Sequence, residues 1–206
     1  MPATKTTSDT SLLSDEALMQ HYAQGDFAAF EQLYLRHKGG LYRYFLRQLG
    51  EQSLAEDLYQ EIWAKVITNA AQYQVSAKFT TWLYTLARHK LVDHIRHLKV
   101  VTKVIDDAHS DNTDQVESID KPEGEYKNPE NLWQDSKASE ALKGCIGFLP
   151  VNQKECFLLK EEAGLSLEVI AQVVDANYEA CKSRLRYAYE SLRQCITRKI
   201  GGELND

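Results

Sequence analysis

The distribution of proline constrains this chain more than any other feature of its sequence. Proline occurs only at positions 2, 122, 129 and 150, so residues 3–121 contain none. Helix interiors exclude proline, whereas turns and strand edges use it often, and a long stretch without it therefore favours helices. The chain also lacks the sustained alternation of apolar and polar residues that marks a half-buried strand. We expect an all-α fold.

Capping residues predict where the helices begin. Ser14 and Asp26 each precede an apolar stripe with helical spacing, and the second of these helices is expected to end at the glycine pair 39–40. Ser53 and Glu56 form a predicted capping box for the next helix, in which leucine, isoleucine and valine recur every four residues. A further long helix is predicted over 79–99.

The apolar periodicity divides the chain into two parts. It fades over residues 100–131, where Asp, Ser, Asn, Pro and Gly accumulate, and it returns over 132–200. We therefore expect two small helical domains, 14–99 and 132–200, joined by a flexible acidic linker over 100–131. Short tails are expected at 1–13 and 201–206.

The last two predicted helices are separated by an unusually short break. LSLEVIAQVV and YEACKSRLRYAYESLRQCITRKI are joined only by residues 175–177, which is typical of a helix-turn-helix. Asp175 would occupy the turn and Asn177 would cap the second helix. In such proteins the first turns of the second helix enter the major groove of DNA. The outward-facing residues there are predicted to be Tyr178, Glu179, Lys182, Ser183 and Arg186, although an ordinary helix pair with a charged surface remains an alternative.

Charge is distributed unevenly along the chain. The formal net charge is −6, but residues 106–140 hold 11 acidic residues and 3 lysines, so the remainder carries about +2. Basic residues concentrate in two predicted helices, at 88–99 and 182–199, where they are either solvated faces or phosphate-binding surfaces. The acidic segment is either a solvated tether or a segment that folds back and competes with DNA.

Other chemistry is weakly represented. Cys145, Cys156, Cys181 and Cys195 form no closely spaced pair, and we expect them to be reduced and mostly buried. A zinc site that combines them with the histidines at 94 and 97 is disfavoured by the spacing. Phosphate loops and nucleophile elbows are missing, so we expect no enzymatic activity, no metal and no cofactor. The polar start of the chain and the lack of a long apolar run predict a cytoplasmic protein.

Four segments together resemble bacterial RNA polymerase sigma factors of the extracytoplasmic-function (ECF) class. They are AEDLYQEIWAKV, FTTWLYTLARHKLVDHIR, FLPVNQKECFLLKEEAGLSLEVIAQVV and CKSRLRYAYESLR, and the resemblance covers roughly residues 15–99 and 134–199. It implies a two-domain factor that binds core RNA polymerase, directs it to promoter DNA and opens the strands. It also implies control by an anti-sigma factor, which is often anchored in a membrane.

The resemblance assigns roles to particular residues. Asp57, Gln60 and Glu61 would contact core polymerase. The downstream promoter element would be bound by Tyr73, Phe79, Trp82, Tyr84, Arg88, Lys90, Arg96 and Lys99. We expect at most half of the four aromatic residues to touch DNA. The upstream element would be bound by Tyr178, Glu179, Lys182, Ser183, Arg184 and Arg186, with Arg184 nearest the buried side of its helix.

The chain departs from the family pattern in three places. The loop QYQVSAK lacks the Arg-Gly or Asp-bearing stretch that is common there, and Asp175 stands where the family often has Gly. Ala180 and Cys181 replace a usual Thr-Val pair, which removes one potential hydroxyl contact to the DNA backbone. These departures leave the promoter sequence open. A second function stays possible on the residues alone, namely a free-standing helix-turn-helix regulator whose first helices dimerise or sense a ligand.

Overall fold

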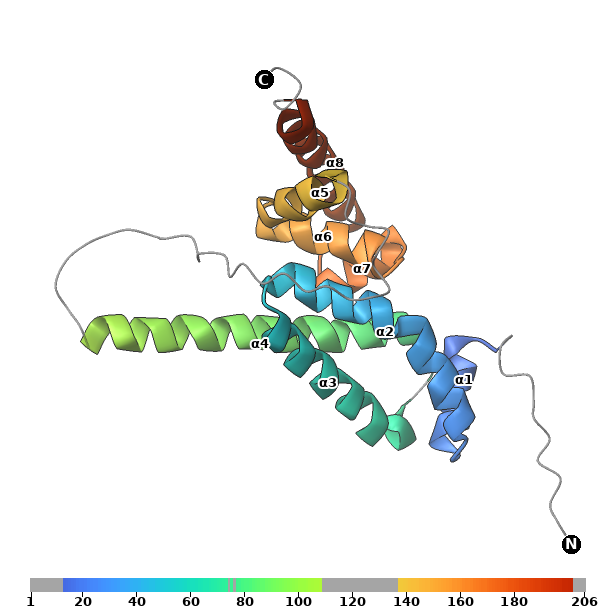
Figure 1. Ribbon diagram of the computed structural model, residues 1–206. Coiled ribbons are helices and arrows are strands. Elements are labelled where there is room, and N and C mark those ends of the chain that lie inside the picture. Colours follow the sequence, from blue (N-terminus) through green and yellow to red (C-terminus); the bar gives the residue numbers. More distant parts are fainter. Residues whose placement is uncertain (1–12, 74, 76, 109–136, 202–206) are drawn as a thin grey trace, which may run out of the picture.

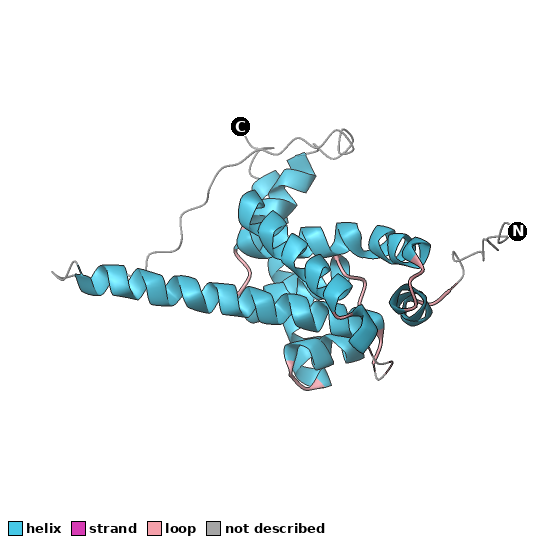
Figure 2. Ribbon diagram, turned by 90° about the horizontal axis from the view of Figure 1, so that it is seen from below, coloured by secondary structure: helices cyan, strands magenta, loops and turns pink. Residues whose placement is uncertain are grey.

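The computed structural model describes residues 13–73, 75, 77–108 and 137–201, with the side chains of 99–108, 137–138 and 200–201 left undescribed. The described residues form helices and no strand, so the all-α prediction is confirmed for them (Figures 1 and 2). The first group is α1 (Asp15–Ala23), α2 (Phe27–Leu49), α3 (Gln52–Thr68), the 3-10 helix η2 (Ala70–Gln72) and α4 (Phe79–Ala108). The second group is α5 (Lys137–Gly147), α6 (Val151–Glu161), α7 (Leu167–Val174) and α8 (Tyr178–Gly201).

Helix α2 lies at the centre of the molecule. It packs against α1 and α3 within its own group, and it contacts α5 and α6 of the second group. The long helix α4 runs beneath α2 and also contacts α7, while its far end extends beyond the other helices (Figures 1 and 2). The two groups of helices therefore pack on one another in this structure.

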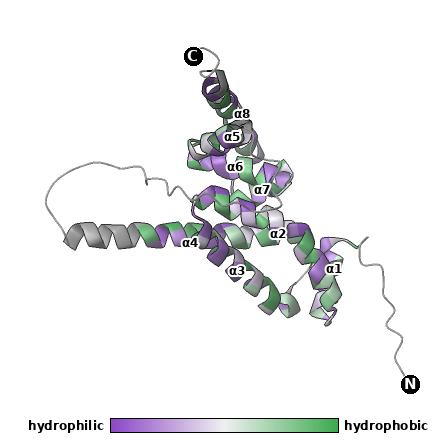
Figure 3. Cartoon of the chain, viewed as in Figure 1, coloured by the Kyte–Doolittle hydropathy of each residue, from purple (hydrophilic) through white to green (hydrophobic). Residues whose placement is uncertain are grey.

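The apolar core is continuous through both groups. Leu33, Phe45 and Ile62 are fully buried in the first group, and Leu158 and Ile170 are fully buried in the second. Burying one such side chain is worth about 1.5–3 kcal/mol, so the core outweighs the weak intrinsic preferences of the short helices. The helices accordingly are amphipathic, with apolar and polar residues on the same helix (Figure 3).

Most of the predicted helix caps are present. Ser14 Oγ accepts a hydrogen bond from the backbone of Ala17 at 3.2 Å, and Asp26 Oδ1 accepts one from Ala28 at 3.0 Å. Asn177 Oδ1 accepts a hydrogen bond from the first turn of α8, at 2.7 Å from the backbone nitrogen of residue 180. Each cap satisfies a backbone donor that the helix itself cannot pair.

Two predicted helix boundaries are wrong. Helix α2 continues through Gly39 and Gly40 to Leu49, and Gly40 serves close packing against Glu162 rather than termination. Helix α3 begins at Gln52 without a side-chain cap, and Ser53 Oγ instead donates a hydrogen bond to Glu51.

Helix α4 is longer than predicted. It continues past Lys99 to Ala108, so the first part of the predicted linker is helical. Between the start of α4 at Phe79 and position 122, the sequence contains neither proline nor glycine to end the helix. The rest of that linker lies outside the described residues.

Two of the four cysteines are oxidised, which corrects the prediction that all are reduced. Cys145 on α5 and Cys195 on α8 form a disulfide, with Cα atoms 5.9 Å apart. The two helices pack side by side, and the 50 residues between the cysteines concealed this proximity in the sequence. Cys156 and Cys181 are buried free thiols, as predicted.

Candidate functional site

The predicted polymerase-binding residues lie on the outer side of α3. Asp57, Gln60 and Glu61 are exposed, whereas Leu58 and Ile62 on the opposite side are buried. The spacing of three and four residues aligns the polar side chains on one face. The carboxylate of Glu61 also forms an ion pair with Lys90 on α4. The strip therefore offers two polar groups and one engaged carboxylate to a partner.

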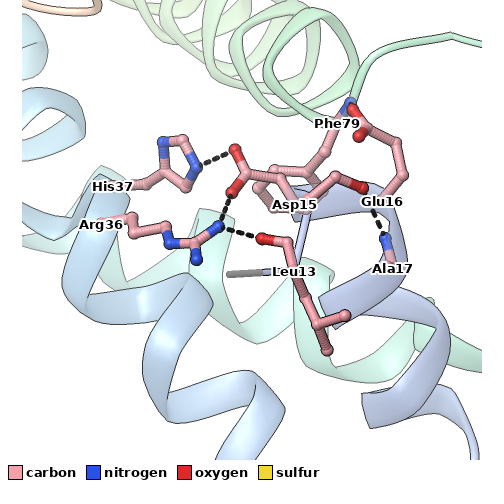
Figure 4. Close-up of polar contacts among 8 residues, drawn as sticks. Leu13, Asp15, Glu16, Ala17, Arg36, His37 and Phe79 are labelled. Carbon is pink, nitrogen blue, oxygen red and sulfur yellow. Dashed lines mark hydrogen bonds and ion pairs between the residues drawn. The ribbon is translucent and has the colours of Figure 1, made fainter. Parts of the chain in front are cut away.

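The start of α4 is held by residues of α1. Glu16 accepts a hydrogen bond from the backbone of Phe79 at 2.8 Å, which caps the long helix from a distant part of the chain. Asp15 lies 2.6 Å from His37 Nε2 and 2.9 Å from Arg36 Nη1, as Figure 4 shows. Burial raises the pKa of Asp15, but hydrogen bonds from His37 and Arg36 outweigh this effect and hold it below its ordinary value.

Three of the predicted DNA-binding aromatic residues form one cluster at this point. Tyr73 and Trp82 are half-buried, with ring centroids 5.4 Å apart, and both pack on Phe79. Phe79 is fully buried and belongs to the core. Burial raises the pKa of Tyr73 to about 12, with the negative charges of Glu16 and Asp15 adding to the effect. Tyr73 and Trp82 are therefore the partly exposed members of this cluster, and the hydroxyl of Tyr73 is itself buried.

A shallow hollow of about 490 Å³ lies beside this cluster. It is lined by Ser14, Glu16, Val75, Ala77 and Lys78. Its walls therefore come from the start of α1 and from the loop before α4, the same loop whose sequence departs from the family pattern.

Tyr84, the fourth aromatic residue, lies in the core and not on the surface. Its ring meets Tyr44 edge-on at 5.7 Å, and burial raises its pKa strongly. Both Phe79 and Tyr84 thus serve packing in this conformation, since the ring of Phe79 packs on His37 and that of Tyr84 on Tyr44, and both partners belong to α2.

The basic residues of α4 point in different directions. Arg88 Nε donates a hydrogen bond to Glu155 Oε1 on α6 at 2.9 Å. Lys90 Nζ lies 2.5 Å from Glu61 Oε2 on α3. Arg96 is exposed near the projecting end of the helix, and the side chain of Lys99 lies outside the described part.

The predicted upstream-element residues lie at the start of α8. Tyr178, Glu179, Lys182, Ser183 and Arg186 are exposed. Arg184 differs from them, because its side chain is half-buried. Burial raises the pKa of the Cys156 thiol, and the nearby positive charge of Arg184 opposes this effect, so this arginine lies close to the core.

The turn before α8 requires a left-handed residue. Asp175 has φ 52° and ψ 56° and carries the only positive φ of a residue other than glycine among the described positions. Asp tolerates this conformation better than most residues.

A cluster of opposite charges that no sequence pattern predicted lies where the two groups of helices meet. Arg43 and Arg47 on α2 face Glu162 at the end of α6, and Arg88 on α4 faces Glu155. These partners lie far apart in the sequence, so no local pattern joins them. The one signal was the glycine pair in α2, since a missing Cβ inside a helix indicates close packing.

Two negative findings apply to the described ranges. Within them, no group of three or more His, Cys, Asp or Glu side chains is arranged to hold a metal ion. No described helix is both long and apolar enough to cross a membrane.

Comparison with known proteins gives a family match in the first group of helices. The profile of Sigma-70 region 2 matches residues 33–100, which span most of α2, all of α3 and much of α4. The chain is 29% identical to the ECF RNA polymerase sigma factor SigK of Mycolicibacterium vanbaalenii over 182 residues, which cover 88% of each protein. It is 27% identical to BldN of Streptomyces coelicolor, an ECF sigma factor, over 89% of this chain and 67% of that protein.

Two solved structures share the fold. The sigma factor RpoE from Bartonella quintana, solved with the anti-sigma factor NepR, aligns with a TM-score of 0.61 at 21% identity, over 82% of this chain and 96% of that one. CnrH, solved with the cytosolic domain of CnrY, aligns with a TM-score of 0.60 at 19% identity, over 87% of this chain and 95% of that one. The arrangement of helices in both groups is therefore one already seen in solved structures.

Proposed function

The chain belongs to the ECF class of RNA polymerase sigma factors, and we propose that it holds core polymerase through α3 and promoter DNA through α4 and α8. The single observation that carries this proposal is the match of Sigma-70 region 2 to the helices that bear both the acidic strip of α3 and the aromatic and basic residues of α4. Its function is transcription initiation. Such a factor directs core polymerase to a promoter and requires no catalytic residue of its own.

The proposed polymerase contact is the strip of Asp57, Gln60 and Glu61. Exposed carboxylates beside a well-packed apolar stripe suit a basic partner surface, where charge complementarity increases the association rate and selects the partner. Glu61 already pairs with Lys90, so binding at this residue exchanges one cation for another.

The proposed contact with the opened downstream element lies at the start of α4. Tyr73 and Trp82 are partly exposed aromatic residues, and the nearby hollow is lined by apolar residues as well as by Ser14 and Lys78. Stacking of one base on an aromatic ring is worth about 1–3 kcal/mol, which offsets much of the cost of unstacking it from the duplex. Binding energy alone can then hold the strands apart.

The proposed contact with the upstream element is the start of α8. Lys182 and Arg186 can reach guanine edges or phosphates, and Ser183 can reach a phosphate oxygen. Arg184 is the weakest member of this set, because its side chain is half-buried whereas the others are exposed.

We propose that the two groups of helices bind promoter DNA separately when the factor is bound to polymerase, the first group at the downstream element and the second at the upstream element. A promoter-bound factor must contact two DNA elements at once. The 28 residues from 109 to 136, between α4 and α5, are a long enough connection for the two groups to move apart. The location we propose is the cytoplasm, where core polymerase transcribes. An anti-sigma factor is a further proposed partner, since the two similar sigma factors were each solved with another protein, named an anti-sigma factor for RpoE.

Run-off transcription with core polymerase and a library of promoters tests this proposal. Added protein should produce discrete transcripts, and it should co-purify with core enzyme that lacks its own sigma factor. Sequence-specific duplex binding without any effect on polymerase would instead indicate a free-standing regulator, which the sigma-factor relatives, aligned over most of the chain, do not favour.

A further inference from the structure

Two carboxylates of α6 cover three arginines of the first group of helices. Glu162 lies 2.5 Å from Arg43 Nε and 3.7 Å from Arg47 Nε, and Glu155 lies 2.9 Å from Arg88 Nε. We call Arg43, Arg47 and Arg88 the covered arginine surface. The two carboxylates are largely shielded from water, with side chains 10% and 17% exposed, so their pairing with Arg47 and Arg88 is only weakly screened. The side chain of Arg43 is 51% exposed, so its pairing with Glu162 is screened more strongly.

The two carboxylates are acceptors that DNA phosphates could replace. Glu155 and Glu162 are seven residues apart and therefore lie on the same side of the chain around α6, about 10 Å apart along the axis. Guanidinium groups bind carboxylate and phosphate with the same paired geometry.

The contact between α6 and these arginines is incompletely satisfied. Among the described atoms, Arg47 Nε and Gln153 Oε1 are buried without a hydrogen-bond partner, and the 3.7 Å from Arg47 to Glu162 is too long for one. Buried polar groups in stable interiors are nearly always paired. A ligand with more oxygens than two carboxylates could satisfy this arginine, so the contact is suited to exchange.

Resting on the proposed function, we propose that the covered arginine surface binds the phosphates of single-stranded promoter DNA, and that Glu155 and Glu162 occupy it until the two groups of helices separate. Arg88 lies on α4 within the segment assigned to the downstream element, so Arg43 and Arg47 extend that DNA surface onto α2. Helix α7 lies against α4 in the same arrangement, so separation breaks that contact as well.

The test removes the covering charge without changing side-chain size. The double variant Glu155→Gln/Glu162→Gln is compared with Glu161→Gln/Glu190→Gln, which changes the net charge equally at two exposed residues outside the contact. A fluorescein-labelled single-stranded DNA oligonucleotide is titrated with each free protein between roughly 50 and 200 mM salt. Run-off transcription with core polymerase is measured for all variants, and circular dichroism verifies folding.

The first variant should bind the oligonucleotide more tightly than the control. Each phosphate contact on a single strand contributes a slope of about −0.7 in log affinity against log salt, so three uncovered arginines should steepen the slope by about 2. Adding Arg88→Gln to that variant should restore about 0.7 of it.

Equal slopes for the two double variants, with transcription intact, would overturn this inference and leave the proposed function standing. A steeper slope that survives replacement of Arg43 and Arg88 by Gln would also overturn it, because the DNA would then be held elsewhere. X-ray scattering could show that the two groups of helices are separated in Glu155→Gln/Glu162→Gln while DNA binding does not improve. That result would overturn the assignment of DNA phosphates to the covered arginine surface and would indicate an acidic protein as its ligand. Failure of the wild-type protein in run-off transcription would instead overturn the proposed function.

Discussion

A single methyl group on Gly40 should weaken the contact between the two groups of helices. A Cβ atom at this position would lie 2.5 Å from the backbone oxygen of Glu162 and 3.1 Å from the hydroxyl of Tyr84, where an ordinary contact is at least 3.4 Å. The backbone oxygen must therefore retreat by about 0.9 Å, and it belongs to the end of α6 that also carries the carboxylate facing Arg43.

The expected size of the effect follows from the cost of overpacking. Inserting a methyl group into a packed contact costs about 1–3 kcal/mol, which lowers the ratio of closed to open molecules about 5- to 150-fold. Within α2 itself, replacing Gly by Ala should add about 0.5–1 kcal/mol of helix stability, so the helix should not unfold.

Hydroxyl-radical footprinting of Tyr84 measures this opening. Tyr84 is buried under Glu162 when the groups are in contact, so Gly40→Ala should raise its oxidation rate relative to the exposed Tyr187. Gly147→Ala at the end of α5 is the control, because nothing lies within 4 Å of a Cβ atom placed there. Equal Tyr84 oxidation in wild type, Gly147→Ala and Gly40→Ala, in folded proteins, would contradict this prediction.

Three further predictions concern stability. Asp15→Asn should lower the free energy of unfolding by about 1 kcal/mol near neutral pH. Because the pKa of Asp15 is lowered in the folded chain, this difference should be full above its ordinary value of 3.8 and vanish as pH falls through the folded value, as urea denaturation at several pH values would reveal. Replacing Cys145 and Cys195 by Ser should destabilise α5 against α8 by up to about 4 kcal/mol, since the bond closes a loop of 50 residues, and added reductant should lower the melting temperature of the wild type alone. Asp175→Gly should raise the stability by about 0.5–1 kcal/mol, because Gly adopts the left-handed turn without strain, and unchanged thermal melting would contradict this.

Features that depend on local sequence were predictable. The helical class followed from the distribution of proline, and the caps at Ser14, Asp26 and Asn177 followed from their position before apolar stripes. The exposed face of Asp57, Gln60 and Glu61 followed from periodicity alone. These patterns repeat within one or two helical turns, so a linear sequence contains them fully.

Features that depend on distant contacts were not predictable. The glycine pair in α2 was interpreted as a helix end, because its close neighbour Glu162 lies more than a hundred positions away. Partners for Arg88 and for Cys145 likewise come from helices remote in sequence. Periodicity places Phe79 and Tyr84 on α4 without saying which aromatic rings the core takes; the packing of α2 decides that.

The most direct test of the account is transcription by core RNA polymerase that has been freed of its own sigma factor. With this protein added, we predict discrete run-off transcripts from a subset of a promoter library, and loss of those transcripts when Asp57 and Gln60 are both replaced by Lys. A folded protein that neither binds core polymerase nor produces any promoter-dependent transcript would contradict the account.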